Sequence, residues 1–332
     1  MPGMSSVSTP AAHALRPRIL ERRARLQQAA GSVSDAYLSE LLSEVDAALE
    51  RIDHGTYGIC ELCHDTIEAD RLEVNPLVRF CLDHLSGPEL EAHQQDLDLA
   101  TRIQARLLPP CRVEAAHWDT HYRYEPVGPV GGDYCELLPL AGSGSLFFAV
   151  GDVAGKGVAA SLLMTHLSAI FRSLLSLDFP LAEVMSRANR LFCESTTGSH
   201  YATLACGRAT AQGLELANAG HCRPLLLRRD GTERVEAAGV PLGMFRGAEY
   251  PVTRATLAQG ESLVLYSDGV TETEDLQGVD FGEDRLIRSL RGRFGGSAET
   301  IALGVVDDVT RFRGARRPFD DLTVLVVRRQ AA

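Results

Sequence analysis

The stretch that decides the fold is residues 146–157, LFFAVGDVAGKG. Its apolar run, 146–150, is typical of a buried strand, and Asp152 follows that run between Gly151 and Val153. Glycine allows the backbone to turn sharply and to approach a ligand closely. A carboxylate at the end of a strand is also held in a fixed position. The stretch therefore predicts a buried strand that delivers an acidic side chain to one defined place.

Three further turns of the chain share this acidic form. They are Gly131-Gly132-Asp133, Tyr266-Ser267-Asp268-Gly269 and Phe319-Asp320-Asp321-Leu322-Thr323. Each alone is compatible with an ordinary Asp-Gly surface turn. Together, converging carboxylates would repel one another unless hard divalent cations such as Mg²⁺ or Mn²⁺ neutralise them. The set therefore predicts a metal site built from Asp133, Asp152, Asp268 and Asp320.

The rest of this half of the chain has the pattern of an α+β domain. From residue 118 onward, short apolar or alternating runs are separated by Gly, Pro and Asp, as in strands. Examples are 146–150, 201–206, 214–217, 225–227, 262–266 and 322–327. Helices are expected at 157–175, 181–195 and 297–312. Strands joined mostly by turns indicate largely antiparallel sheets.

The N-terminal part has helical periodicity instead. Residues 15–54 are rich in Leu, Ala, Glu and Arg, and Gly31 and Ser32 interrupt them. We expect a helical hairpin with its turn at Gly31–Ser34. Its second helix has one apolar stripe, formed by Leu38, Leu41, Leu42, Val45, Leu49 and Ile52. The expected division is a disordered tail at 1–14, a hairpin with a zinc finger at 15–87, a linker helix at 88–110 and a larger domain at 111–330.

The linker helix, 89–108, should end at Pro109-Pro110. An approximate heptad seam runs along it, with Gln104 inside the seam; the apolar members are Leu90, Leu97, Ala100 and Leu107. Such a seam is compatible with pairing to a second copy in a homodimer. It is equally compatible with one face packing on the helix's own domain.

Residues 55–85 contain two short pairs of metal-ligand residues, Cys60-x2-Cys63 and Cys81-x2-His84. Two pairs at this spacing can close a tetrahedron around Zn²⁺. Ordinary core cysteines are the alternative, but four ligands in two matched pairs favour zinc. Because no coordination position stays open, the zinc should be structural.

Composition limits the classes of function. The chain has 332 residues, 45% hydrophobic, with a formal net charge of −11. This length favours two domains, and an acidic chain is repelled by nucleic acid and anionic membranes. We see no apolar run near the ~18 residues of a membrane helix and no signal peptide. The eight cysteines do not form a dense disulfide framework, so a reducing cytoplasm is expected.

The cysteine-rich segment resembles the DksA/TraR zinc-finger family over about residues 35–85. The matching segments are 48–52 (ALERI), 55–63 (GTYGICELC) and Arg71-Leu72. Members of that family usually have cysteine at the last ligand position, where this chain has His84. They act on RNA polymerase through a coiled-coil tip. The short hairpin here, without an acidic tip motif, favours a regulatory or dimerising module.

The larger domain resembles the SpoIIE/RsbU branch of the PPM metal-dependent protein phosphatases over residues 100–328. The resemblance rests on eight blocks in the family's order: 103–109, 130–134, 151–157, 218–221, 239–243, 265–272, 281–282 and 320–323. It implies a β-sandwich flanked by helices, with two metals at one edge.

The resemblance also implies roles for single residues. Asp152 should bridge both metals and the Val153 carbonyl should bind one of them. Asp133 should hold one metal, while Asp268 and Asp320 hold the other. Asp321 is expected to support these ligands from behind. Glu136 stands where relatives often have Asp, and its role is open. His221 would be a general acid or, as we prefer, a structural residue.

The function implied is that of a protein serine/threonine phosphatase, a phosphoric monoester hydrolase. Water activated by two Mn²⁺ or Mg²⁺ ions would cleave phosphoserine or phosphothreonine on a regulatory protein. By family analogy the substrate is a STAS-type anti-sigma-factor antagonist, in signal transduction that regulates a sigma factor. One alternative is a non-catalytic phosphoprotein-binding scaffold, which the four retained aspartates disfavour. Another is a zinc-finger transcription regulator acting on RNA polymerase, which the acidic charge and the short hairpin disfavour.

Overall fold

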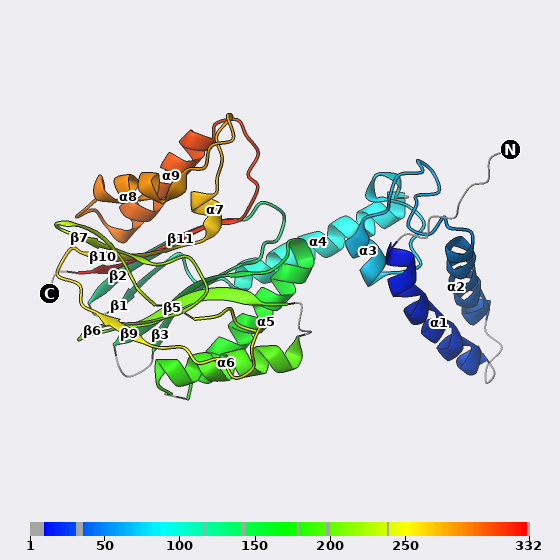
Figure 1. The fold of residues 1–332 in the computed structure, drawn as a ribbon, viewed down its shortest axis with the longest axis horizontal. Coiled ribbons are helices and arrows are strands. Elements are labelled where there is room, and N and C mark those ends of the chain that lie inside the picture. The colour runs from blue at the N-terminus through cyan, green and yellow to red at the C-terminus, as the bar shows by residue number, and fades with distance from the viewer. Residues whose placement is uncertain are drawn as a thin grey trace. The chain divides into compact units, whose positions relative to one another are not determined.

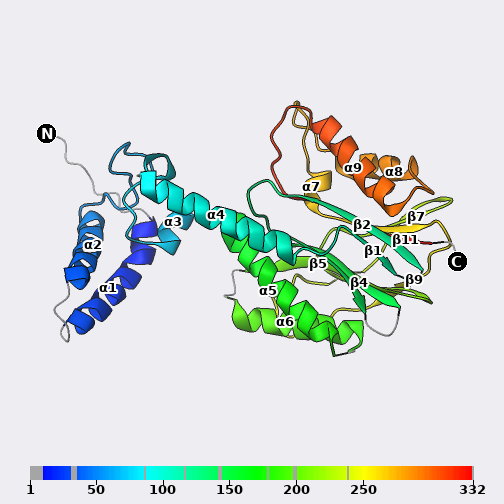
Figure 2. The same cartoon turned by 180° about the vertical axis from the view of Figure 1, so that it is seen from behind.

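The computed structural model describes residues 10–30, 36–85, 87–115, 117–140, 144–177, 179–196, 200–237 and 239–330. The chain forms two compact units, Met1–Gln95 and Asp96–Ala332. Figures 1 and 2 show the ribbon from opposite sides.

The first unit contains the predicted helical hairpin. Helices α1 (Pro10–Ala30) and α2 (Ala36–Asp53) lie side by side (Figure 1), followed by α3 (Ala69–Val74) and the short 3-10 helix η1 (Leu82–His84). Two ion pairs join the helices, Arg16 to Asp53 at 2.9 Å and Arg23 to Asp46 at 2.6 Å. These pairs run in opposite order along the two helices, so the helices are antiparallel. The expected turn at Gly31–Ser34 lies outside the described residues.

Helix α1 begins earlier than the sequence suggested. Residues 10–14, expected in the disordered tail, are helical, while residues 1–9 lie outside the described part. The local sequence explains the early start. Proline is well accepted in the first helical turn, where its missing N–H has no partner to lose. The alanines at positions 11, 12 and 14 are strong helix formers.

A small core holds the first unit together. Buried side chains of the hairpin meet those of the cysteine-rich loop; they are Leu15, Ile19, Val45, Ala48, Tyr57, Cys60, Ile67, Leu72, Leu77 and Cys81. Two of these ten residues are predicted zinc ligands, so the metal centre belongs to the core of this unit. A core this small gains much of its stability from a bound metal.

The second unit is a sandwich of two sheets. One sheet has the order β1-β2-β11-β10-β7-β8 and the other β3-β4-β5-β6-β9. Every neighbouring pair in both sheets is antiparallel. The strands are β1 (Arg112–Ala115), β2 (Trp118–Glu125), β3 (Asp133–Leu140), β4 (Ser145–Val153), β5 (Ala202–Thr210), β6 (Gly213–Ala219), β7 (Leu225–Arg228), β8 (Gly231–Arg234), β9 (Thr253–Ala255), β10 (Ser262–Tyr266) and β11 (Leu322–Arg329). The α+β fold class is confirmed.

Helices cover the outer face of each sheet (Figures 1 and 2). Helices α5 (Gly157–Leu175) and α6 (Leu181–Ser195) pack on the five-stranded sheet, while α8 (Gly282–Arg291) and α9 (Ala298–Arg313) pack on the six-stranded sheet. The short α7 (Asp268–Thr271) follows β10. A third apolar core, which includes Trp118, Phe148 and Leu325, lies between the sheets. Burial of these apolar surfaces is the main force that holds the four layers together.

The expected helices at 157–175, 181–195 and 297–312 correspond to α5, α6 and α9. Helix α8 was not expected. It offers only Leu286, Ile287 and Leu290 as large apolar side chains over ten residues, which is too short a window for its periodicity to stand out.

Helix α4 (Gly87–Leu107) is the predicted linker helix and ends before Pro109-Pro110. From Asp96 onward it belongs to the second unit. There Leu97 lines a cavity and Gln104 is only 5% exposed. Hence the predicted seam, from residue 97 on, packs on the helix's own unit. The apolar side chains exposed in this part are Leu99 and Ile103.

One helix of the described residues, α5, is long and apolar enough to cross a membrane by length and composition alone. This corrects the expectation that no such stretch exists. Half of its apolar window is buried inside the unit. Phe171 and Leu167 of this helix belong to the core against the five-stranded sheet, so core packing accounts for its composition.

Candidate metal centres

The four predicted zinc ligands meet in the first unit. The ligand atoms of Cys60, Cys63, Cys81 and His84 all lie within 4.8 Å of one another. Cys81 Sγ is 3.7 Å from Cys63 Sγ and 3.2 Å from His84 Nδ1. Three thiols and one imidazole at these separations are the donor set of a closed tetrahedral zinc site, so the residues fit the metal.

Tight turns bring the first two cysteines to this point. Gly58 and His64, which flank them, both have positive φ, of 82° and 62°. Burial opposes ionisation of Cys60, but backbone N–H groups of Cys63, Cys81 and Leu62 outweigh it and lower the pKa of Cys60 to about 6. A thiolate at neutral pH is the form that binds zinc.

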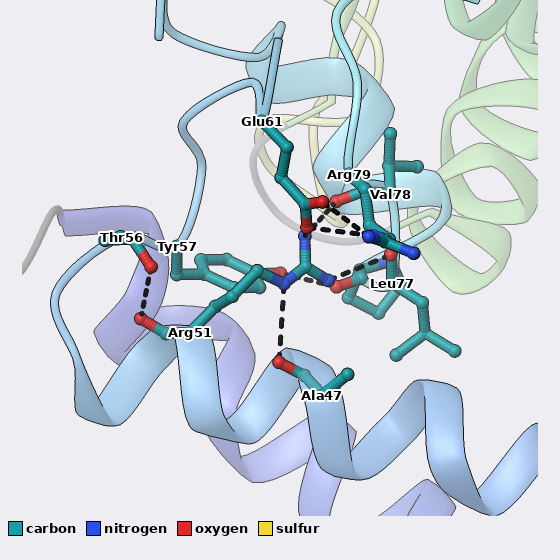
Figure 3. Close-up of polar contacts among 9 residues, drawn as sticks. Ala47, Arg51, Thr56, Tyr57, Glu61, Leu77, Val78 and Arg79 are labelled. Atoms are coloured by element: carbon teal, nitrogen blue, oxygen red, sulfur yellow. Dashed lines mark hydrogen bonds and ion pairs between the residues drawn. The ribbon is translucent and has the colours of Figure 1, made fainter.

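Arg51 of α2 fixes the loop that leads to the second ligand pair (Figure 3). Its guanidinium donates to the carbonyl oxygens of Leu77 and Val78, at 3.1 and 3.0 Å. Glu61 lies 3.7 Å from the same guanidinium and accepts two hydrogen bonds from Arg79, at 2.8 and 2.5 Å. Burial lowers the pKa of Arg51. Arg51 therefore joins the hairpin to both halves of the zinc loop.

In the second unit, the structure brings the four predicted aspartates to one edge of the sandwich. Asp133 begins β3 and stands directly opposite Asp152 near the end of β4. Asp268 begins α7 just after β10, and Asp320 lies just before β11. Because strand ends from both sheets contribute, the site exists only when the two sheets are packed together.

A cavity of about 200 Å³ lies at this edge. Its walls include Asp152 and Asp320 together with the backbone of Gly131 and Gly132. A Cβ added at Gly132 would lie 3.2 Å from the Val153 carbonyl oxygen and 3.5 Å from Asp152 Oδ1. These two oxygen atoms, both predicted to bind metal, therefore face the same loop.

Burial and mutual repulsion raise the pKa values of three of these carboxyl groups. Burial raises the pKa of Asp133 well above its ordinary value. Burial, then the charges of Asp268 and Asp320, raise the pKa of Asp152 to about 7. Burial and Asp320 likewise raise the pKa of Asp268. Divalent cations would remove the repulsion that these shifts report.

The carboxylates lie further apart than the zinc ligands. Among the described residues, only the Cys–His cluster has three or more ligand atoms within 4.8 Å of one another. A wider ring of oxygen ligands suits two cations about 4 Å apart better than a single small one. The all-oxygen donors also suit Mg²⁺ or Mn²⁺ rather than zinc, so the residues fit such a pair.

Asp321, which the sequence predicted to lie behind the ligands, accepts hydrogen bonds from the backbone of the loop before β3. Its Oδ1 accepts from the N–H of Val127 at 2.8 Å, and its Oδ2 accepts from the N–H of Gly132 at 2.7 Å. A Cβ at Gly131 would overlap Asp321 Oδ2 and the Tyr124 hydroxyl, and one at Gly269 would overlap the Asp321 carbonyl oxygen. Both glycines are therefore required by close packing around Asp321.

Two hydroxyl residues of the quoted turns have roles that the sequence did not reveal. Thr323 donates to Asp133 Oδ2 at 2.5 Å. Ser267 Oγ accepts from the N–H of Thr323 at 2.9 Å and donates to the Asp321 carbonyl oxygen at 3.3 Å. The sequence signal that could have identified them is their position inside the acidic turns. They connect the turn of Asp268 to that of Asp320.

Lys156 is a further residue that sequence reasoning did not place in the site. Its Nζ lies 3.1 Å from Asp320 Oδ2 and 2.8 Å from the Phe319 carbonyl oxygen, over the Phe319 ring at 4.1 Å. Asp320 thus already binds one cationic group, which supports its capacity to bind a metal ion.

The structure shows the surroundings of the two residues whose roles the sequence left open, His221 and Glu136. His221 is buried, and its Nδ1 lies 2.9 Å from Thr203 Oγ1. Burial lowers the pKa of His221 to about 4, so it is neutral at pH 7 and a poor general acid. Glu136 is 1% exposed and accepts from Arg172 at 2.8 and 3.0 Å. Glu136 is therefore the buried half of an ion pair with the partly exposed Arg172.

Two helix-flanked antiparallel sheets with acidic turns at one edge define the fold class of the PPM metal-dependent phosphatases. The PP2C domain of SiaA from Pseudomonas aeruginosa has this fold, with a TM-score of 0.64 and 20% identity over 73% of this chain and 98% of that one. In the first unit, the prokaryotic dksA/traR C4-type zinc finger matches residues 55–83. The fourth ligand, His84, differs from the cysteine that this family description implies.

Within that class, the chain belongs to the SpoIIE family, because the model of Stage II sporulation protein E (SpoIIE) matches residues 142–330. Protein IcfG of Synechocystis sp. is 26% identical over 268 residues, 70% of this chain and 41% of IcfG. Phosphoserine phosphatase RsbU of Bacillus subtilis is 25% identical over 241 residues, 71% of each protein. The chain therefore spans less than half the length of IcfG.

Proposed function

We propose that this chain is a metal-dependent protein serine/threonine phosphatase that removes phosphate from a regulatory protein. One observation carries the proposal: aspartates from four separate turns line one edge of the sandwich, where Asp152 and Asp320 face a single cavity. The name of the relative RsbU, a phosphoserine phosphatase, supports the same reaction. The four retained aspartates disfavour a non-catalytic scaffold.

The lining of the cavity supports water as the nucleophile. The described residues around it include no Ser, Thr, Cys or His, and we assign its aspartates to cation binding, which leaves water as the nucleophile. Two bound Mn²⁺ or Mg²⁺ ions would lower the pKa of a coordinated water and polarise the phosphoryl oxygens.

The chain's own residues would hold and orient these groups. Asp152 would hold both ions and the Val153 carbonyl one of them, with Asp133 on one side and Asp268 and Asp320 on the other. Lys156, at the rim beside Asp320, would place a positive charge near a phosphoryl oxygen. Because His221 is neutral, we assign protonation of the leaving serine oxygen to water.

A second cavity adjoins the first and offers hydrogen-bond donors to the part of a substrate around the phosphoserine. It has a volume of about 140 Å³ and shares Asp320 with the first cavity; its charged lining is mixed, with Arg313, Arg316 and Arg317 beside Glu272 and Glu274. Arg316 pairs with Glu274. The Nε of Arg313 is buried without a hydrogen-bond partner among the described residues. Such donors suit carboxylate or phosphate groups.

The finer parts of the proposal rest on family resemblance. We assign the substrate to the STAS-type anti-sigma-factor antagonists and the place of action to the cytoplasm. The zinc centre would be structural and would hold one Zn²⁺. A homodimer through α4 would use its exposed apolar side chains Leu90, Leu99 and Ile103. Light scattering of the purified chain measures its molar mass and so tests whether it is a dimer.

The test is Mn²⁺-dependent release of phosphate from p-nitrophenyl phosphate and from a serine-phosphorylated STAS protein. Wild type should turn over both substrates, and Asp152→Asn should abolish both activities. Glu249→Gln, an exposed carboxylate outside both cavities, is the matched control and should behave as wild type. Absence of turnover with any metal and either substrate rejects the enzyme proposal.

A further inference from the structure

Gln104 is a buried polar side chain on α4 whose amide donates to and accepts from the backbone of one residue of the site, Gly131. Its Nε2 donates to the Gly131 carbonyl oxygen at 2.7 Å, and its Oε1 accepts from the Gly131 N–H at 3.2 Å. The side chain is 5% exposed. A buried amide that satisfies both groups of one residue fixes the orientation of the two peptide units beside it.

The segment that Gln104 contacts has little regular structure of its own. Residues 126–132 lie between β2 and β3 and belong to neither strand. Side chains from other elements satisfy much of their backbone. Asp321 accepts from Val127 and Gly132, and Thr101 of α4 donates to the Pro129 carbonyl oxygen at 3.0 Å. The position of this segment therefore depends on α4 and on the turn before β11.

A second set of hydrogen bonds connects the end of α4 to β3, the strand that begins at Asp133. Arg172 of α5 donates to the Leu107 carbonyl oxygen at 3.0 Å, as well as to both carboxylate oxygens of Glu136. Glu136 lies in β3, three positions after Asp133. Hydrogen bonds to a buried charge are strong, and their loss leaves that charge unpaired. The last turn of α4 is thus linked through Arg172 to β3, at a position three residues after Asp133.

We propose that Gln104 is a positioning residue that sets the affinity of the Asp133 side of the carboxylate site for its divalent cation. Asp133 follows the Gly131-Gly132 peptides directly. Any tilt of these peptides moves its carboxylate relative to that of Asp152, which stands opposite. Metal affinity depends steeply on ligand placement. This inference rests on the proposed metal-dependent function and adds the helix side chain on which that site depends.

A purely structural Gln104 predicts a different result. It would lower the unfolding temperature when replaced, while the folded fraction would still bind cations as wild type does. A positioning residue changes the dissociation constant for the cation in folded protein. It leaves turnover at saturating cation nearly intact, because no reacting atom is touched.

The experiment uses the full chain and titrates Mn²⁺ by isothermal calorimetry, alongside phosphate release as a function of Mn²⁺ concentration. Gln104→Leu should raise the dissociation constant about 10-fold, with turnover at saturating Mn²⁺ within about threefold of wild type. The dissociation constant of Gln104→Glu should lie between those of wild type and Gln104→Leu. Glutamate keeps an acceptor for the Gly131 N–H but has no donor for the Gly131 carbonyl oxygen. Gln95→Leu, the same change at an exposed position of α4, is the control.

Each outcome decides the matter. An unchanged Mn²⁺ dissociation constant in Gln104→Leu, or an equal rise in Gln95→Leu, overturns the inference. If Gln104→Leu does not fold, Gln104→Glu and Thr101→Val carry the same comparison. If wild type binds Mn²⁺ but hydrolyses no substrate, the proposed function fails while calorimetry still tests Gln104. A wild type that binds no Mn²⁺ rejects both.

Discussion

The two candidate metal centres of this chain are built in opposite ways. All four candidate zinc ligands lie between residues 60 and 84, and their ligand atoms are within 4.8 Å of one another. The four aspartates of the second unit extend from residue 133 to residue 320, and they meet only through strands of two packed sheets. The first centre is local in sequence, whereas the second is a product of the whole fold.

This difference separates what each metal does for the protein. The small core around Cys60 and Cys81 includes the ligands themselves, so zinc should contribute directly to folding of the first unit. The sandwich has three extensive apolar cores of its own and should fold without cations. We expect loss of the first metal to change stability and loss of the second to change activity.

The largest expected effect comes from Asp268→Asn. Several kcal/mol of transition-state stabilisation by the metals correspond to a loss of about 10²- to 10³-fold in turnover. The zinc content, measured by mass spectrometry of the metal, should stay that of wild type, because the two centres share no ligand. Zinc loss in this variant would show that the centres are not independent.

Cys60→Ser should act on the other side of the comparison. We expect the variant to lose zinc and residues 36–85 to become sensitive to protease, while turnover of p-nitrophenyl phosphate stays within about threefold of wild type. Limited proteolysis with mass spectrometry measures the first effect. Leu62→Ser, an exposed neighbour in the same loop, serves as control. A collapse of small-substrate turnover would contradict the separation.

Gly131→Ala sharpens the account of the carboxylate site. Its Cβ would overlap Asp321 Oδ2 and the Tyr124 hydroxyl, and such overpacking costs about 1–3 kcal/mol. We expect turnover to fall about 10-fold and the Mn²⁺ concentration for half-activity to rise. Gly247→Ala should have no effect, since no atom lies within 4 Å of its added Cβ. If Gly131→Ala and Gly247→Ala had the same turnover and the same Mn²⁺ dependence, close packing at Gly131 would not be needed for the site.

The smallest effect should follow Arg51→Ala. It removes donors to the Leu77 and Val78 carbonyl oxygens, which should destabilise the zinc module by about 1–3 kcal/mol. Release of zinc to a chromogenic chelator should become faster, with phosphatase turnover unchanged. Arg51→Lys, which cannot reach both carbonyls at once, should show most of the same acceleration. If both variants released zinc at the wild-type rate, the metal alone, and not Arg51, would hold the zinc loop in place.

The sequence predicted the local centre more completely than the distant one. The spacing of Cys60 and Cys63 itself specifies a ligand pair, because a short turn can place two thiols on one metal. Asp152 could be named as a candidate from the strand before it. That Asp133 stands opposite Asp152 follows from the β3–β4 register, which no single turn encodes.

Residues that act through packing were the ones that the sequence could not assign. From the sequence, Gln104 was only a polar residue inside an apolar seam. Its partner could not be foreseen, because Gly131 is 27 positions away. Glu136 had no visible partner because Arg172 lies on a later helix. Helix α8 was missed because it is short. The helical start at Pro10 was missed because the composition of that segment is typical of a disordered tail. For Gln104 and Glu136 the decisive contact is tertiary.

The ion pair between Lys156 and Asp320 has a consequence for the order in which the carboxylate site fills. A cation entering on the side of Asp320 must compete with a tethered amine, whereas no such amine contacts Asp133 among the described residues. The two proposed cation positions would therefore be unequal from the start, and loading should be sequential. Once displaced, the Lys156 amine would be free beside Asp320 and the exposed Phe319 ring, where it would be available to the phosphate of the proposed substrate.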